Sequence, residues 1–116
     1  MRIPRARAPL VRRRPGVMNK TEERYAEHLA LAQRGGEIAD FWFESVKLKL
    51  ADLTFYTPDF FVQKTDGTLE MHEVKGFWED DARVKIKVAA SMFPFRFIGV
   101  QERAKKNGGG WEYEEF

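Results

Sequence analysis

The sequence contains no cysteine, and this absence removes several classes of chemistry. Disulfide bonds, thiolate nucleophiles and zinc sites with cysteine ligands are all excluded. The absence fits a reducing compartment, and we expect a cytoplasmic protein. No apolar run approaches the roughly 18 residues that cross a bilayer, and no apolar segment follows the basic N-terminus as in a signal peptide. The sequence therefore predicts neither membrane insertion nor secretion.

The chain is also short, since 116 residues suffice for one domain with a modest core. A hydrophobic content of 43% that includes ten Phe indicates a folded domain rather than a disordered chain. There is no room for a separate recognition domain. We therefore expect loops, tails or a second subunit to hold any substrate.

Acidic residues are missing from the first 17 positions, which instead contain six arginines: Arg2, Arg5, Arg7, Arg12, Arg13 and Arg14. Three prolines interrupt any helix in this segment, so residues 1–17 are interpreted as a flexible basic arm that suits a phosphate backbone. In the alternative interpretation the arm is a start-site artefact, because Met18 could head a shorter product.

The remainder of the chain has the opposite charge. Six of the 20 Lys and Arg residues lie in the arm, which leaves 14 basic against 18 acidic residues and a net charge of −4. Residues 18–116 are therefore predicted to form a single, mildly acidic domain.

The first predicted element is a helix over about 20–34, where apolar residues recur at helical spacing. Asn19 or Thr21 can cap its start, and the following glycines end it. The helical phase places Glu22 at the edge of the apolar face and turns Glu23 towards water. Glu23 stays the alternative inward acid if this phase is wrong.

Three strands are predicted next, over about 41–50, 54–63 and 68–75, with an irregularity near Ser45. The sequence Asp66-Gly67 favours a tight turn that joins the last two strands into a hairpin.

A second helix is predicted from Asp80 or Asp81 to about residue 92, with an apolar line formed by Val84, Val88 and Met92. Strands over 95–100, parallel to a preceding strand, and over 111–116 complete the pattern. The fold class is thus mixed α/β in the order α-β-β-β-α-β, with the strand over 111–116 as an optional last element, and with a central mixed sheet of four to five strands flanked by helices.

Two acids and a lysine are predicted to converge at the end of the hairpin. Glu73 and Lys75 are two residues apart on one strand and share a face, and the antiparallel partner can place Asp59 beside them. Burying like charges is unfavourable unless a proton or cation neutralises one of them. Mg²⁺, with Mn²⁺ as a substitute, would resolve this conflict through both carboxylates, the Val74 carbonyl and water, and Glu22 could complete a second metal site.

These residues resemble the motif of the PD-(D/E)XK nuclease superfamily, which stands here as Pro58-Asp59 and Glu73-Val74-Lys75. Over about residues 18–100 the chain is also similar to phage endonucleases that resolve four-way Holliday junctions, and to small phage proteins of unassigned function. The shared segments read Thr-Glu-Glu-Arg, Tyr-Thr-Pro-Asp-Phe, Glu-Val-Lys-Gly and Phe-Trp-Glu-Asp-Asp-Ala-Arg. The junction-resolving enzymes have a further basic C-terminal region that this chain lacks.

The resemblance implies a restriction-endonuclease-like core and metal-dependent hydrolysis of duplex or branched DNA, in phage recombination, repair or packaging. It implies that Glu22, Asp59 and Glu73 coordinate metal and that Lys75 is the catalytic lysine. The residues implied to bind DNA are Arg83, Lys85 and Lys87, and the arm adds Arg12, Arg13 and Arg14. A homodimer is expected from the small size and the resemblance, and the host cytoplasm is the expected location.

Other interpretations of the same residues are open. Asp59 could brace the turn after Pro58, and Glu73 with Lys75 could form a solvated strand face. The basic residues at 83, 85 and 87 could be an ordinary solvated helix face. His72 points away from Glu73 and is assigned no catalytic role. At the level of function, the rivals are a catalytically silent DNA-binding or regulatory module, and an interaction protein that uses its sheet edge and acidic C-terminal strand.

Overall fold

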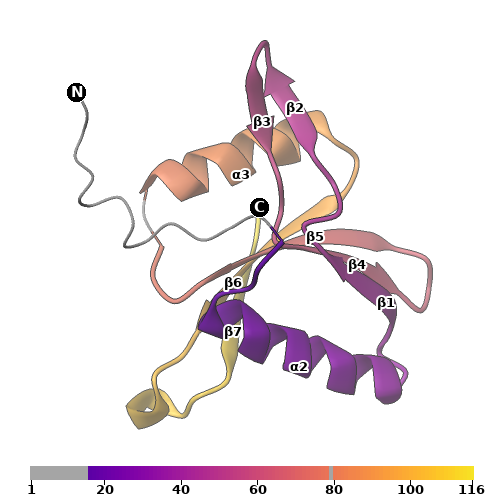
Figure 1. Ribbon diagram of the computed structural model, residues 1–116, viewed down its shortest axis with the longest axis vertical. Helices are drawn as coiled ribbons and strands as arrows, with labels where there is room; N and C mark the ends of the chain where they lie inside the picture. Colours follow the sequence, from indigo (N-terminus) through magenta and orange to yellow (C-terminus); the bar gives the residue numbers. More distant parts are fainter. Residues whose placement is uncertain (1–15, 79) are drawn as a thin grey trace.

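The computed structural model describes residues 16–78 and 80–116. A five-stranded sheet forms its centre, with the strand order β1-β4-β5-β6-β7 (Figure 1). These strands are β1 (Ile38–Phe43), β4 (Phe60–Lys64), β5 (Leu69–Lys75), β6 (Arg96–Glu102) and β7 (Trp111–Glu115). Strands β5 and β6 are parallel, and the other neighbours in the sheet are antiparallel. The predicted mixed α/β fold is thus confirmed.

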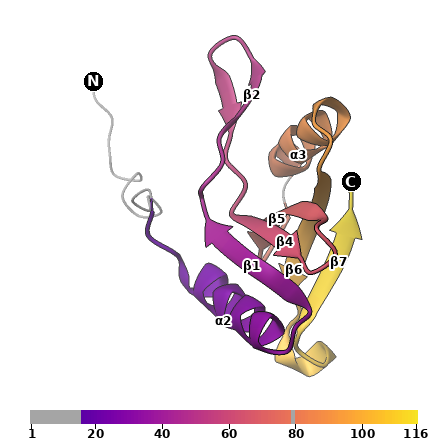
Figure 2. The same ribbon diagram turned by 90° about the vertical axis from the view of Figure 1, so that its right-hand side faces the viewer.

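Two helices of the described residues cover opposite faces of this sheet (Figure 2). They are α2 (Lys20–Arg34) and α3 (Asp80–Met92), and α3 is the crossover between the parallel strands. Alternate residues of β5 enter different cores, because Val74 packs in the α2 layer and Met71 in the α3 layer. One strand therefore supplies side chains to both faces. No helix in the described ranges is long and apolar enough to span a bilayer.

Helix α2 has the predicted bounds, and its start is fixed by a reciprocal capping box. The Asn19 side chain accepts a hydrogen bond from the Glu22 N–H, and the Glu22 carboxylate accepts one from the Asn19 N–H. Tyr25 and Leu29 point into the core from the same face. The cap therefore sets the rotation that turns Glu22 inward.

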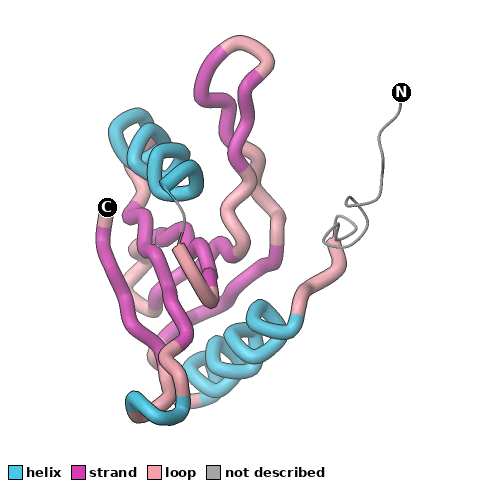
Figure 3. The backbone as a smooth tube through the Cα atoms, turned by 90° about the vertical axis from the view of Figure 1, so that its left-hand side faces the viewer, coloured by secondary structure: helices cyan, strands magenta, loops and turns pink. Residues whose placement is uncertain are grey.

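The prediction of continuous strands over 41–50 and 54–63 was wrong. Each divides into two, and the additional strands β2 (Leu48–Ala51) and β3 (Thr54–Tyr56) pair with one another in a separate hairpin. Glu44 has a positive φ of 48°, which ends β1, and the segment around Pro58 separates β3 from β4. The hairpin leaves the sheet because Leu48 and Tyr56 are buried against α3 (Figure 3).

The predicted apolar line of the second helix was also wrong. Val84, Val88 and Met92 are exposed, with 58%, 38% and 49% of their surfaces accessible. The buried residues of α3 are instead Ile86 and Ala89, which face the sheet and the hairpin. The packing face thus combines the large Ile86 with the small Ala89, which allows close approach of the helix, and the line of Val84, Val88 and Met92 lies outside it.

The predicted turn, the parallel crossover and the last strand were correct. The Asp66 carboxylate accepts a hydrogen bond from the Thr68 N–H and closes the turn before β5. The proposed arm of residues 1–17 lies outside the described residues as far as position 15, and Arg12, Arg13 and Arg14 lie outside with it.

Candidate active site

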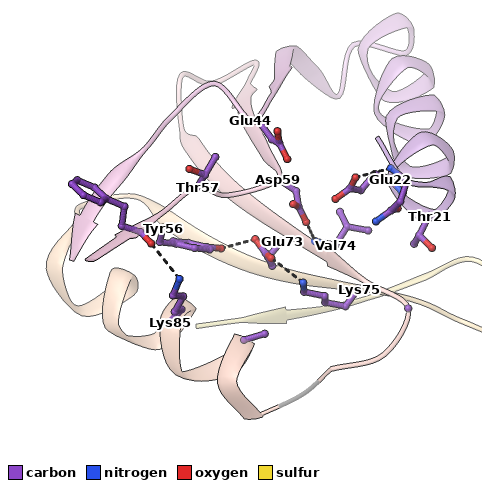
Figure 4. A pocket seen from close by; sticks show the side chains of 14 residues that line it. Thr21, Glu22, Glu44, Tyr56, Thr57, Asp59, Glu73, Val74, Lys75 and Lys85 are labelled. Atoms are coloured by element: carbon purple, nitrogen blue, oxygen red, sulfur yellow. Dashed lines mark hydrogen bonds and ion pairs between the residues drawn. The ribbon is translucent and has the colours of Figure 1, made fainter. Parts of the chain in front are cut away.

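A cavity of about 480 Å³ opens where the start of α2, the β2–β3 hairpin and the end of β5 meet (Figure 4). Its polar lining combines acids and lysines. The charged residues in the lining are Glu22, Glu44, Asp59, Glu73, Lys75 and Lys85. The acids and the lysine predicted from the motif therefore share one cavity.

The bend between β3 and β4 carries Asp59 to this cavity. Phe60 pairs with His72, so the antiparallel register places Asp59 opposite Glu73. One oxygen of the Asp59 carboxylate accepts a hydrogen bond of 2.8 Å from the Val74 N–H. The side chain is only 6% exposed, and its orientation is fixed by the backbone of β5.

Glu73 and Lys75 face the same side of β5, as strand alternation predicts. The Lys75 ammonium lies 3.3 Å from Oε2 of Glu73. The other oxygen, Oε1, accepts a hydrogen bond of 2.8 Å from the Tyr56 hydroxyl. Burial raises the pKa of the Tyr56 hydroxyl, and the neighbouring Glu73 charge raises it further, so Tyr56 is a neutral donor at pH 7. Sequence reasoning assigned no role to Tyr56, because its hydroxyl reaches Glu73 through the packing of the β2–β3 hairpin against α3.

The electrostatics of the cavity favour an added positive charge. Burial raises the pKa of Asp59 to about 9, and the charge of Glu73 acts in the same direction. Burial also raises the pKa of Glu73, although Lys75 opposes this effect. One lysine thus does not neutralise two buried acids, and the pair retains a proton or attracts a cation.

Glu22 lies at the rim of the same cavity and is 2% exposed, whereas Glu23 is exposed on the outer side of α2. Its charge raises the pKa of Asp59 further. Of the two acids left open by the sequence, Glu22 is therefore the one that the fold brings to the site.

Glu44 is an acid of the cavity lining that sequence reasoning did not single out. Its backbone N–H donates to the Asp59 carbonyl at 2.8 Å, and its carboxylate accepts from the Gly16 N–H at 2.9 Å. Figure 4 shows this carboxylate on the same side of the cavity as Asp59. Only the antiparallel register of β1 and β4 reveals the position, because Phe43 opposite Phe60 places Glu44 next to Asp59.

The donor set suits a hard divalent cation that keeps much of its water. In residues 16–78 and 80–116, no three His, Asp or Glu side chains are grouped tightly enough to enclose an ion. Two carboxylates with water meet the preference of Mg²⁺, which binds few protein ligands. The Val74 N–H is occupied by Asp59, and the Val74 carbonyl stays a predicted ligand.

The predicted DNA-binding residues of α3 have different surroundings. Lys85 lines the cavity and donates to the Phe55 carbonyl at 3.3 Å, and Lys87 is exposed. Arg83 forms a two-pronged ion pair with Glu114 of β7, at 2.9 and 2.5 Å. The structure therefore brings Lys85 to the site and turns Arg83 towards the C-terminal strand.

A second polar cluster occupies the opposite face of β5. His72 bonds to Glu70 at 2.9 Å and to the Tyr25 hydroxyl at 2.7 Å, and all three side chains are buried. Arg96 donates to the other Glu70 oxygen at 2.9 Å. This network joins β5 to α2 and β6, and His72 lies away from the cavity, as strand alternation predicts.

Three comparisons with known proteins found no match. No protein-family model matches the chain, and neither a curated protein nor a solved structure does. The resemblance to PD-(D/E)XK nucleases thus stays a prediction, and function has to follow from the residues of the cavity.

Proposed function

We propose that the chain is a magnesium-dependent endodeoxyribonuclease of the PD-(D/E)XK type. The observation that carries this proposal is the buried pair of Asp59 and Glu73, with the Lys75 ammonium 3.3 Å from Glu73, in an open cavity. Burial raises the pKa of both acids, and the charge of Glu73 raises that of Asp59 further, so the pair is an unfavourable way to build a core. A bound divalent cation would offset their negative charge, so a metal site accounts for the burial of both acids.

Asp59 and Glu73 would hold Mg²⁺ or Mn²⁺, together with the Val74 carbonyl and water, and Glu22 would contribute to a second ion. Once bound, the ion supplies Lewis-acid stabilisation of the scissile phosphate and lowers the pKa of a bound water. The protein keeps Glu73 in one orientation through Tyr56 and positions the Lys75 charge beside it. A fixed charge at this place stabilises the pentavalent phosphate and costs no reorganisation during the reaction.

The proposed substrate is DNA, either duplex or branched, and a homodimer is the proposed assembly. The domain is mildly acidic outside the basic arm. Binding of a polyanion therefore depends on the bound cation, the arm and the lysines near the cavity. Lys85 is the one of these lysines that shares the cavity lining with Lys75.

The test is a cleavage assay with supercoiled, linear and four-way-junction DNA in Mg²⁺, Mn²⁺ or EDTA. We expect cutting by the wild-type chain only with a divalent ion, and a loss of at least a hundredfold in Asp59→Asn and Lys75→Ala, in the range for removal of an electrostatic catalytic group. Glu23→Gln is the matched control, because it removes an exposed acid next to Glu22 and should cut normally.

The other outcomes are equally informative. Metal-dependent binding without any cutting would indicate the catalytically silent module. Indifference to both DNA and metal would exclude the nuclease and leave an interaction protein. Sedimentation of the DNA-bound protein as a monomer would contradict the homodimer without affecting the proposed chemistry.

A further inference from the structure

The β2–β3 hairpin has two chemically different faces. Leu48 pairs with Tyr56, and both are buried against α3. Lys49 pairs with Phe55 on the outer face, where Lys49 is exposed and Phe55 is 39% exposed. Lys47 shares this outer face, with its ammonium 4.5 Å from the centre of the Phe55 ring. The outer face is therefore a strip of two lysines and an aromatic ring.

This strip is continuous with the candidate active site. Phe55 lines the same cavity as Asp59 and Glu73. Lys85 of α3 lines it too and donates to the Phe55 carbonyl at 3.3 Å. Figure 1 shows the hairpin rising from the sheet beside α3, so a chain that leaves the cavity along this direction passes over the strip.

Within residues 16–78 and 80–116, neither the two lysines of the strip nor Lys85 forms an ion pair with an Asp or Glu. The arginines near β7 are neutralised instead, through the pairs Arg83–Glu114, Arg96–Glu115 and Arg103–Glu112. Positive charge that can exchange its counterions for phosphates is thus present at the hairpin and largely cancelled near β7.

We propose that the outer face of the hairpin binds a DNA strand with unpaired bases next to the scissile phosphate. This inference rests on the proposed phosphodiesterase function. Lys47, Lys49 and Lys85 contact the phosphates that flank the reacting one, and Phe55 stacks on a base. A base inside a duplex has both faces covered, so stacking on Phe55 requires a base that has left its stack. The preferred substrate is therefore single-stranded or branched DNA rather than a regular duplex.

The test measures binding by fluorescence anisotropy in EDTA, where metal-dependent cleavage is stopped. The probes are a labelled single strand and the corresponding duplex. For Lys47→Ala/Lys49→Ala we expect about 25-fold weaker binding of the single strand at 0.1 M salt, and a salt slope shallower by about 1.4, from roughly 0.7 per lost phosphate contact. The matched control is Lys105→Ala/Lys106→Ala, which removes the same charge from η1 (Lys105–Asn107), at the other end of the molecule (Figure 1). It should bind like the wild type.

Phe55 provides the second measurement. Phe55→Ala should weaken binding of the single strand by about fivefold or more and leave duplex binding unchanged, because only an unpaired base can stack on the ring. Phe55→Leu keeps the apolar volume and should show the same selective loss. Thermal denaturation of each variant establishes that the fold is intact.

Two results would overturn the inference: equal weakening by the hairpin pair and the η1 pair, or Phe55 variants that do not discriminate between strand and duplex. These failures are distinct from failure of the proposed function. If the wild type cuts DNA with metal but the hairpin variants bind DNA as well as the wild type does, the hairpin site is refuted and the proposed nuclease function is not. Selective loss of binding without any cutting by the wild type supports the hairpin site and refutes the nuclease.

Discussion

Replacement of Asp59 by Asn should make the metal-free protein more stable and less sensitive to pH. Burial, assisted by Glu73, raises the pKa of the Asp59 carboxyl to about 9 in the folded protein, against about 4 in an unfolded chain. Between pH 5 and pH 8 the folded state therefore retains a proton that the unfolded state has released. Because the folded state binds more protons, its stability falls as the pH rises through this window.

The size of the effect follows from the number of protons involved. One proton corresponds to a slope of at most about 1.4 kcal/mol per pH unit, so three units set a ceiling of roughly 4 kcal/mol. The Val74 N–H and Lys75 offset part of this by stabilising the Asp59 anion. We expect the free energy of unfolding to fall by about 1–4 kcal/mol between pH 5 and pH 8. Each kcal/mol corresponds to roughly 4 °C in Tm.

The assay is thermal denaturation by circular dichroism in EDTA at pH 5, 6, 7 and 8, repeated with Mg²⁺. Asp59→Asn should abolish most of the pH slope and raise Tm at pH 8. At a hundredfold excess over Kd, Mg²⁺ should raise the free energy of unfolding of the wild type by about 2.7 kcal/mol, and its Tm accordingly. It should not affect the variant. Asp52→Asn, at the exposed tip of the hairpin, is the control. A wild-type Tm that is flat across this window, or a variant less stable than the wild type at pH 8, would refute the reasoning.

Three further changes probe the surroundings of the site. Tyr56→Phe removes the donor to Glu73, and we expect about a tenfold slower metal-dependent cleavage with little change in DNA affinity, measured as kcat and KM. Gly99→Ala would place a Cβ 2.8 Å from Cζ2 of Trp78, and urea denaturation should show a free energy of unfolding lower by about 1–3 kcal/mol. His72→Ala removes the hydrogen bonds of the buried Tyr25 and Glu70 to the imidazole, and should lower the free energy of unfolding by about 1–3 kcal/mol. The cleavage rate per folded molecule should stay normal, and a loss of that rate would show that His72 takes part in the chemistry.

The parts of the site that the sequence predicted depend on local geometry. Strand alternation aligns Glu73 with Lys75, and a short hairpin brings Asp59 opposite them. The bounds of α2 followed from its cap and its terminal glycines. Local rules of this kind need no knowledge of the rest of the fold.

The parts that were missed depend on tertiary packing. The β2–β3 hairpin leaves the sheet because α3 offers a surface for Leu48 and Tyr56. That surface is made by Ile86 and Ala89, and not by the exposed Val84. Tyr56 reaches Glu73 only as a result of this departure. Helical periodicity in α3 indicates which residues are apolar, and does not indicate which face finds a partner.

Because β5 supplies side chains to two cores, packing on the α2 side of the sheet determines which residues of β5 point into the cavity. A slip of one residue would turn the Glu73 side chain into the apolar α2 layer and the Val74 side chain out of it. The bonds of His72 to Glu70 and Tyr25 oppose such a slip without touching the cavity. When these bonds are lost, a slip would still bury the Glu73 carboxylate in the apolar layer, so that layer keeps the strand in register. Side chains that never touch the cavity thus determine which residues of β5 point into it.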